Sequence, residues 1–480
     1  MARMISPEAY GLVAMAYVVI HFGSHFSELG FGPALIQKQD IKPQDIGTAY
    51  FTAFGTGILF FVVGYLIAPT AAVFFAEPEL VAILRVASAI FLLGPITAIS
   101  INLLRRALRF KVTSGIEIAG FALGTGLVGI SLAILGYGVW SLIAAALGNS
   151  LIRFILSLVA VRHEFHLSFD KNSFRTLFAF GGKYSLTGFF EVITYRVDTI
   201  FIAYFLNSTL VGIYNRASFL VQIPTQYLWN VVNRVIFPSL SEARTEPNRL
   251  MAGYRSAFLF LGIILFPFCI GISIGAREIV LVILGPQWHD AVPILRILAV
   301  GVPFHLLLHL NGILYDVKNK LTLKLTIRFC HLVFICLLYY IMRGYGLAGF
   351  AIAFMVTEIV FYFIYTFCMF LFIDPDWRKM VARHVTIFWI TLVTGGAVGA
   401  AVLMGHLIGA PDIAVLAIEM LAGATALVVC TVIFPPRLVR ADISNRFGGG
   451  ELQLAENGII GRGLHWYLSR LVAKDRDRPW

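Results

Sequence analysis

Long apolar runs follow one another along almost the whole chain, and this feature restricts the fold more than any other. All but one of these runs approach or exceed the roughly 20 residues that a helix needs to cross a bilayer. Apolar residues make up 59% of the 480 positions and charged residues 13%, which excludes a soluble enzyme, a disordered chain and a receptor with one membrane anchor. The thirteen predicted helices of this all-α polytopic membrane protein are 8–35, 45–75, 79–103, 113–135, 139–160, 177–205, 211–240, 257–275, 293–315, 329–341, 349–373, 385–404 and 413–434.

Positive charge alternates from one connection between predicted helices to the next. Six connections contain 19 of the 37 lysines and arginines, and the other six contain only Arg277 and Arg343. Cytoplasmic loops attract Lys and Arg, so the first set and the C-terminus are predicted to be cytoplasmic. Topology then explains most of the net charge of +11, and nucleic acid is not expected as a partner. The basic connections are 36–44, 104–112, 161–176, 241–256, 316–328 and 374–384.

Short matches in the same order indicate that the chain is an internal repeat. Corresponding loops share the same predicted side, which favours a parallel repeat with its two-fold axis along the membrane normal. The matches are Gly11 with Gly212, Pro33-Ala34-Leu35 with Pro238-Ser239-Leu240, Ile83-Leu84-Arg85-Val86 with Ile294-Leu295-Arg296-Ile297, and Gly136-Tyr137-Gly138 with Gly344-Tyr345-Gly346.

The repeat predicts five segments. The first, 1–160, is an N-terminal lobe of five helices, and the cytoplasmic linker 161–176 leads to a C-terminal lobe of six helices at 177–373. Two additional helices follow at 374–434. The basic cytoplasmic tail 435–480 contains a predicted amphipathic helix, 459–474, that lies on the inner leaflet.

The first lobe is one helix short of the second. The partner of helix 177–205 would end near Met1, so we expect fourteen helices in the intact protein. The first helix would then be missing through a start-site error or a truncated gene. An in-frame start codon upstream would settle which.

Charged residues inside the predicted helices are the candidates for function, because a charge at mid-bilayer costs at least about 2.5–3.5 kcal/mol. Arg196 and Asp198 lie deep in helix 177–205. Glu191 shares one helical face with Asp198, Lys183 is near that face, and Arg196 is on the other side. One face is then expected to look into a polar cavity while the other meets a partner helix. The alternative is a buried ion pair between helices.

His21, His25 and Glu28 recur at the spacing of one helical face. That pattern could bind a metal or relay protons, but a hydrated stripe near a lumen is the preferred interpretation, and no metal site is predicted. Glu358 is a lone acid in an aromatic-rich span, where it either packs or lines a lumen. Arg153 and Glu419 stay undecided. The five cysteines fall in apolar runs without a CxxC pair and are predicted to be buried packing residues.

The sequence lacks the HExxH, nucleophile-elbow and Walker motifs, so no catalytic residues are predicted. Instead, a series of stretches between residues 4 and 434 resembles the Wzx-type polysaccharide exporters. These oligosaccharide-lipid flippases form the colanic-acid exporter-like branch of the MATE-like (MOP) superfamily. The stretches are SPEAYGLVAM (6–15), SELGFGPALIQ (27–37), PELVAILRVAS (78–88), LRRALRFK (104–111), GYGVWSL (136–142), FGGKYSL (180–186), YRVDTIFIAYFL (195–206), GIYNRASFLVQIP (212–224), VIFPSLSEAR (235–244) and LGPQWHDAVPILRILA (284–299).

The resemblance implies a fold of fourteen helices, two lobes of six plus two, which agrees with the expected missing helix. Where the family often has Asp before Leu-Gly, this chain has Glu28. The implied activity is translocation of an undecaprenyl-diphosphate-linked oligosaccharide across the bacterial inner membrane by alternating access, for exopolysaccharide or lipopolysaccharide biosynthesis. The candidate site residues are Arg196, Arg216 and Lys183 for the anionic head group, and Asp198, Glu191 and Glu28 for coupling or gating.

Beyond the lipid-linked oligosaccharide and membrane lipids, the expected partners are a polysaccharide polymerase and export machinery. No cofactor is expected other than a coupling cation or proton. The alternatives are a cation-coupled drug antiporter of the same superfamily, a flippase for a lipid-linked peptidoglycan precursor, a membrane polysaccharide polymerase or ligase, and a non-functional fragment. A polymerase would be expected to carry a sizeable periplasmic loop, whereas the longest outer connection is 276–292.

Overall fold

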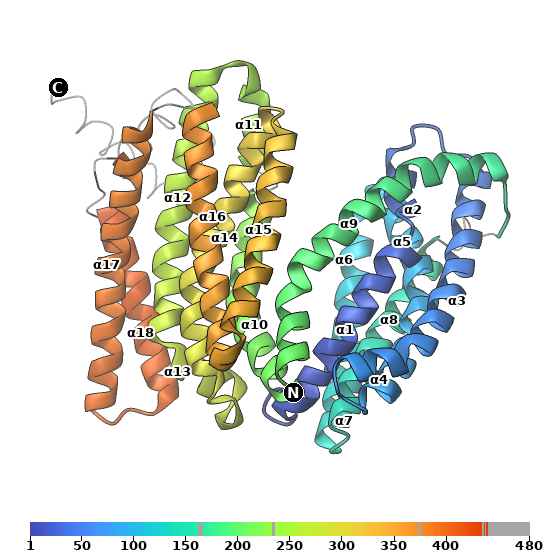
Figure 1. Cartoon of the computed structure of the whole chain (residues 1–480), viewed down its shortest axis with the longest axis horizontal. Coiled ribbons are helices and arrows are strands. Elements are labelled where there is room, and N and C mark those ends of the chain that lie inside the picture. The colour runs from blue at the N-terminus through green and yellow to red at the C-terminus, as the bar shows by residue number, and fades with distance from the viewer. Residues whose placement is uncertain (162–166, 233–235, 373–375, 434–435, 437, 440–480) are drawn as a thin grey trace. The chain divides into compact units, whose positions relative to one another are not determined.

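The computed structural model describes residues 1–161, 167–232, 236–372, 376–433, 436 and 438–439, and within them it is helical without any strand (Figure 1). The all-α prediction is therefore confirmed. The chain divides into two compact units. Unit 1 comprises 1–216, 284–291 and 336–350, and unit 2 comprises 217–283, 292–335 and 351–480. The units group residues by proximity, so the lobe boundaries derived from the repeat stay a prediction.

Unit 1 is built around its first helix, α1 (Pro7–Ser27). Ser6 caps this helix, because its side chain accepts a hydrogen bond of 3.3 Å from the amide of Ala9, and Pro7 occupies the first turn. Helix α1 packs against α3, α4, α5, α8 and α9. The other helices are α2 (Phe31–Gln37), α3 (Pro43–Phe74), α4 (Leu80–Ala87), α5 (Ile90–Arg106), α6 (Phe110–Ala119), a π-helical segment (Gly120–Gly129), α7 (Ile130–Ile134), α8 (Val139–Val161), α9 (Lys171–Phe205) and the first residues of α10 (Ser208–Val231).

Two predicted helices are each two helices in the structure. The predicted helix 8–35 breaks between α1 and α2, where Leu29 and Gly30 have φ values of 48° and 64°. Both the backbone conformation and the packing require glycine at residue 30. Its φ is positive, and a Cβ there would overlap the carbonyl of Gly181 on α9. The predicted helix 79–103 likewise divides at Ser88 into α4 and α5.

Hydrogen bonds gather several helix ends at one end of unit 1. The guanidinium of Arg106, at the end of α5, donates to the carbonyls of Leu35, Ile36, Lys38 and Gln39 just after α2. Arg109 donates to Ala160 at the end of α8 over 3.3 Å, and the amide of Asp170 before α9 donates to Thr48 of α3 over 2.9 Å. Three of the predicted basic connections, 36–44, 104–112 and 161–176, therefore lie at the same end of unit 1.

Unit 2 holds the remaining helices. A buried polar network joins α12, α14 and α16: the hydroxyl of Tyr254 donates to Asn311, whose amide donates to Thr366 over 3.2 Å. The unit contains the rest of α10, α11 (Phe237–Glu242), a 3₁₀ turn (Ala243–Thr245), α12 (Pro247–Ile274), α13 (Ala276–Ile279) with a π-helical continuation (Val280–Leu284), α14 (Ala291–Val317), α15 (Leu321–Met342), α16 (Gly346–Phe372), α17 (Trp377–Leu407) and α18 (Asp412–Val428) with a π-helical end (Val429–Ile433). The last part of α15 and the first residues of α16, within 336–350, belong to unit 1.

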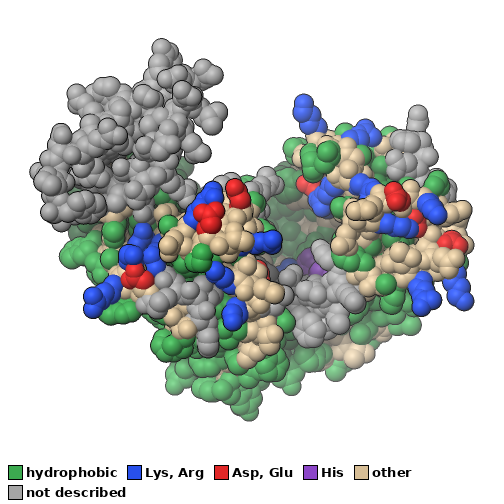
Figure 2. All heavy atoms as spheres, turned by 90° about the horizontal axis from the view of Figure 1, so that it is seen from above, with side chains coloured by type: hydrophobic (Ala, Val, Ile, Leu, Met, Phe, Trp, Pro, Cys, Tyr) green, Lys and Arg blue, Asp and Glu red, His purple; other side chains and the backbone are tan. Residues whose placement is uncertain are grey.

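Ten helical segments in the described residues are long and apolar enough to cross a membrane, and one of them, Thr322–Leu371, includes both α15 and α16. The protein is thus a multi-pass membrane protein, while the count of thirteen crossings stays a prediction. Figure 2 shows Lys and Arg side chains at the surface of the molecule, and several of the predicted basic connections carry exposed Lys or Arg side chains within each unit. Those at the predicted cytoplasmic connections include Lys42, Arg105, Arg109, Lys111 and Arg175 in unit 1, and Arg244 and Arg249 in unit 2.

The predicted amphipathic helix 459–474 and nearly all of the tail 435–480 lie outside the described residues. The cytoplasmic position of the C-terminus therefore stays a prediction. The prediction for the cysteines was wrong in part: only Cys269 is buried, and Cys330 is exposed on α15. It lies in a largely apolar helix, and an apolar run in a membrane helix also supplies the surface that faces outward.

Candidate functional site

One face of α1 carries a row of polar side chains. Tyr10, Tyr17, His21 and Glu28 are spaced seven, eleven and eighteen residues from the first, which places them on one side of the helix. Tyr10 is buried, Tyr17 and His21 are half-buried, and Glu28 is exposed. We call these four residues the polar face of α1. The rings of Tyr17 and His21 stack with their centroids 5.5 Å apart.

Arg196 of α9 acts on the middle of this face. It interacts electrostatically with Tyr17 and His21 of α1 and with Asp198 of its own helix. Its side chain is half-buried, and among the described residues no carboxylate lies within the 4.0 Å of an ion pair. Arg196 therefore holds a cation inside an apolar helical unit without a described ion-pair partner.

Asp198 is bound mainly to its own backbone. Its carboxylate accepts hydrogen bonds from the amide of Thr199 at 2.6 Å and from the Thr199 hydroxyl at 3.2 Å. The half-buried carboxylate thus keeps its charge compensated locally, without a bond to Arg196. The prediction that these two residues point to different sides of α9 stays a prediction.

Arg216 of α10 acts near the first turn of α1. Its guanidinium carbon lies 4.3 Å from the centroid of the Tyr10 ring, a cation–π contact, and it donates to Asn215 over 3.2 Å. The Tyr10 ring in turn meets the edge of Trp288 at 5.4 Å, and the Trp288 indole donates to the carbonyl of Ala2 over 2.9 Å. Tyr10 and Tyr17 are two turns apart, so the two arginines meet α1 at levels roughly 10 Å apart.

Glu28 lies at the far end of the polar face and interacts electrostatically with Arg153 of α8. The Nε atom of Arg153 is buried without a hydrogen-bond partner among the described residues, beside the similarly buried Oδ1 of Asn149. Glycine at 120 makes room for the arginine, because a Cβ there would lie 2.6 Å from Arg153 Cγ. Arg153, whose role the sequence left undecided, thus interacts with the candidate residue Glu28.

Two candidates cannot be placed. The side chains of Lys183 and Glu191 on α9 lie outside the described residues. The predicted substrate and coupling roles of all six candidates stay predictions.

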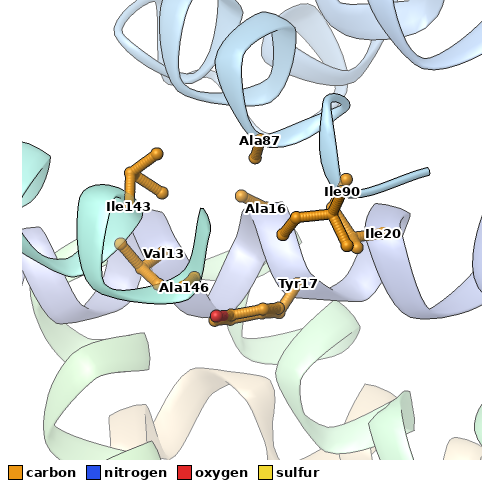
Figure 3. A pocket seen from close by; sticks show the side chains of 8 residues that line it. All are labelled: Val13, Ala16, Tyr17, Ile20, Ala87, Ile90, Ile143 and Ala146. Carbon is orange, nitrogen blue, oxygen red and sulfur yellow. The ribbon is translucent and has the colours of Figure 1, made fainter. Parts of the chain in front are cut away.

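A small apolar pocket lies beside α1 (Figure 3). Its lining is aliphatic except for the Tyr17 ring, and it offers no charged group. A sugar or diphosphate would lose its hydrogen bonds with water there, so this pocket is a packing gap. It is lined by Val13, Ala16, Tyr17, Ile20, Ala87, Ile90, Ile143 and Ala146.

Unit 2 contains a second polar cluster. Glu358 of α16 lies between two histidines: its Oε2 is 3.1 Å from Nδ1 of His305 on α14, and its Oε1 is 3.2 Å from Nε2 of His331 on α15. The sequence singled out Glu358 but missed both histidines. The signal available was that the three residues fall within three successive predicted helices, although His331 is only two residues from the start of its own.

The described part of the chain has no group of three or more His, Cys, Asp or Glu side chains arranged to hold a metal ion. The interpretation of His21, His25 and Glu28 as a hydrated stripe stays a prediction. What unit 1 offers is a set of cations placed beside aromatic rings and hydroxyls.

Comparisons with known proteins agree with this description. Residues 1–293 match the model of a family described as polysaccharide biosynthesis protein. The teichuronic acid biosynthesis protein TuaB of Bacillus subtilis (strain 168) is 29% identical over 299 residues, 61% of this chain and 61% of that protein. The lipopolysaccharide biosynthesis protein WzxC of Escherichia coli (strain K12) is 24% identical over 306 residues, 62% of this chain and 61% of that protein.

The matched region thus spans about three fifths of each of these relatives. Among solved structures, the lipid II flippase MurJ in an inward closed conformation superposes with a TM-score of 0.69 at 15% identity, covering 90% of this chain and 93% of MurJ. This likeness shows a shared fold. The family match confirms the resemblance to proteins of polysaccharide biosynthesis.

Proposed function

The chain belongs to the polysaccharide biosynthesis protein family, and from that premise we propose that it moves an undecaprenyl-diphosphate-linked oligosaccharide across the bacterial inner membrane. The oligosaccharide would pass from the cytoplasmic to the periplasmic leaflet by alternating access, for exopolysaccharide or lipopolysaccharide biosynthesis. WzxC is named for lipopolysaccharide biosynthesis, and the fold is that of a structure titled as a lipid II flippase. Both names are consistent with a transporter that has no catalytic residues.

The chemistry of such a substrate defines what the protein must supply. Sugar hydroxyls and a diphosphate cannot enter hydrocarbon without losing hydrogen bonds to water. A diphosphate calls for cations at membrane depth, and arginine is suited to phosphate because its fork of donors matches the phosphate oxygens. The polyprenyl tail can stay in the surrounding lipid, so only the head group needs a polar path.

The observation that supports the proposal most is the half-buried cation of Arg196, which faces Tyr17 and His21 and has no ion-pair partner among the described residues. A buried cation of this kind is costly unless an anion joins it. The diphosphate would be that anion. Arg216, held over the ring of Tyr10, would meet the head group at the other level of α1.

Further roles follow from the proposal. Lys183 would assist the arginines, and Asp198, Glu191 and Glu28 would serve in coupling or gating. The C-terminus would be cytoplasmic, a polysaccharide polymerase and export machinery would receive the product, and no cofactor would be needed other than a coupling cation or proton.

The test replaces Arg196 and Arg216 with Ala, singly and together, and measures polymer at the cell surface with the protein level controlled by immunoblot. Arg85→Ala is the matched control, since Arg85 also stacks on a tyrosine, Tyr65, at 4.6 Å. We expect export to fall at least about tenfold in the double variant, which corresponds to losing one charge-assisted contact. Unchanged export in both single variants and the double would refute the cationic site.

A further inference from the structure

The cluster of His305, Glu358 and His331 lies at mid-membrane depth in unit 2. Each residue is at least ten positions from either end of its helix, on α14, α16 and α15 respectively, which neighbour one another (Figure 1). Ionisable residues at this depth are rare because of their cost, and they usually mark ion or proton sites. Three of them converging from three helices is therefore a functional arrangement to be explained.

Burial within the cluster is uneven. The Glu358 side chain is 2% exposed and that of His331 is 12% exposed, whereas His305 is 29% exposed. The carboxylate is therefore sealed inside the unit, and His305 is the most exposed of the three side chains.

The two contacts of Glu358 differ in geometry. His331 Nε2 forms a hydrogen bond with Oε1, whereas Oε2 and the facing Nδ1 of His305 are buried without a hydrogen-bond partner among the described residues. Yet these two atoms are only 3.1 Å apart. An acceptor oxygen and a ring nitrogen held so close without a hydrogen bond leave a place for one proton.

The net charge of the cluster also favours binding of one proton. With both imidazoles neutral, the cluster has the single negative charge of Glu358, and one proton on a histidine cancels it. Imidazole exchanges its proton between about pH 5 and 8, so the cluster can change charge under cellular conditions. The metal alternative is weaker, because the described residues show no group arranged to hold a metal ion.

The side chains around His305 have contacts of their own. His309, one turn along α14, has its Nδ1 at 2.9 Å from the carbonyl of His305, and its ring packs on Trp229 of α10 at 5.0 Å. Arg328 of α15 interacts electrostatically with His305, His309 and Tyr365. The remaining ring against His305 is Phe354.

We propose that His305, Glu358 and His331 form a proton-binding site within the membrane-spanning part of unit 2. A hydronium ion gives one proton to Nδ1 of His305 and leaves as water. The protonated ring then donates to Oε2 of Glu358, which stays ionised, while His331 holds Oε1. If the function proposed above holds, this proton is the coupling ion for export, and it binds in a different unit from Asp198, Glu191 and Glu28.

The closing experiment needs no substrate, because Trp229 provides a reporter. The full chain is purified in detergent and its tryptophan fluorescence is followed from about pH 8 to about pH 5, the range of an imidazole. His309 contacts Trp229, and its ring lies 4.5 Å from His305, so protonation of His305 is expected to change the emission. Trp229→Phe identifies the part of the signal that comes from this position.

Glu358→Gln removes the negative charge, so the midpoint of the fluorescence step is expected to move at least about one pH unit lower. His305→Gln is expected to abolish the step, and His289→Gln, a change at an exposed histidine elsewhere, is expected to leave it unchanged. His331→Gln is the second variant in case Glu358→Gln does not fold; a shift in the same direction supports the proposal. A step that keeps its midpoint in the folded Glu358, His305 and His331 variants overturns it.

The proposed function is tested separately in cells. Nigericin, which collapses the transmembrane pH difference, is expected to slow polymer export at least about threefold in the wild type and to have little further effect in His305→Gln. Export that is equally sensitive in both overturns the coupling role. Absence of any export activity would refute the transport function and leave the fluorescence titration as it stands.

Discussion

The backbone of Gly11 lies so close to the carbonyl of Ser208 that a Cβ atom on residue 11 would overlap it. The same close approach is found between the other two residues, since a Cβ on Gly212 would overlap the carbonyl of Pro7. Gly11 and Gly212 are matching positions of the internal repeat, and Pro7 and Ser208 each precede them by one helical turn. Reciprocal contacts of this kind are the mark of a two-fold relation. The repeat inferred from the sequence therefore has a physical contact at its centre.

We predict that Gly11→Ala and Gly212→Ala each destabilise the protein by about 1–3 kcal/mol, because the added methyl must push a helix backbone aside. The measurement is the apparent midpoint of thermal unfolding in detergent. Gly55→Ala on α3 is the control: a Cβ there meets nothing within 4 Å, so its midpoint should be unchanged or higher. Equal midpoints for all three variants and the wild type would refute the close crossing.

Arg106 is predicted to stabilise the protein by joining the end of α5 to the segment that follows α2. Arg106→Ala removes the donor for four carbonyl groups and should cost about 2 kcal/mol, since hydrogen bonds from a charged group contribute more than neutral ones. Arg105→Ala is the matched control, because its pair with Glu117 at 3.4 Å is half exposed on both sides and contributes about 0–1 kcal/mol. Equal losses in unfolding midpoint would contradict this assignment.

The N-terminus of α9 is predicted to be sensitive to acid. The amide and then the hydroxyl of Ser173 hold the pKa of Asp170 below its ordinary value. A carboxylate with a depressed pKa stabilises the folded state fully above its unfolded pKa of about 3.9, and the stabilisation is lost as the pH falls through the folded value. Unfolding midpoints of wild type and Asp170→Ala should therefore differ at neutral pH and converge in acid. A difference that does not shrink as the pH falls would argue against this cap.

Tyr10 is predicted to position Arg216 for the substrate. Tyr10→Phe keeps the ring beneath the guanidinium at 4.3 Å and should retain export, whereas Tyr10→Leu removes the cation–π contact, worth about 0.5–2 kcal/mol, and should lower export several-fold. Export is measured at equal protein level. A Tyr10→Leu variant as active as Tyr10→Phe would show that the ring does not position Arg216.

Helix periodicity and charge predicted most of the described helices, but they did not predict where those helices are interrupted. The interruption at Leu29 and Gly30 arises because Gly181 of α9 approaches there, and a single sequence does not show which distant glycine will face it. Similarly, the resemblance pointed to Arg196 and Arg216, but only the fold showed that both meet α1, through Tyr17 and Tyr10. The role of Arg153 beside Glu28 was open for the same reason.

The sequence by itself determined the all-α membrane class, because that depends on composition and on the order of apolar runs along the chain, while the cytoplasmic side of the basic loops and the two lobes of the repeat stay predictions. The tertiary structure decided which charges share an environment. His305, His331 and Glu358 are far apart in sequence, and no periodicity within one helix can bring them together. Their cluster exists because three helices pack with their middles aligned, and packing between helices is a property of the folded chain alone.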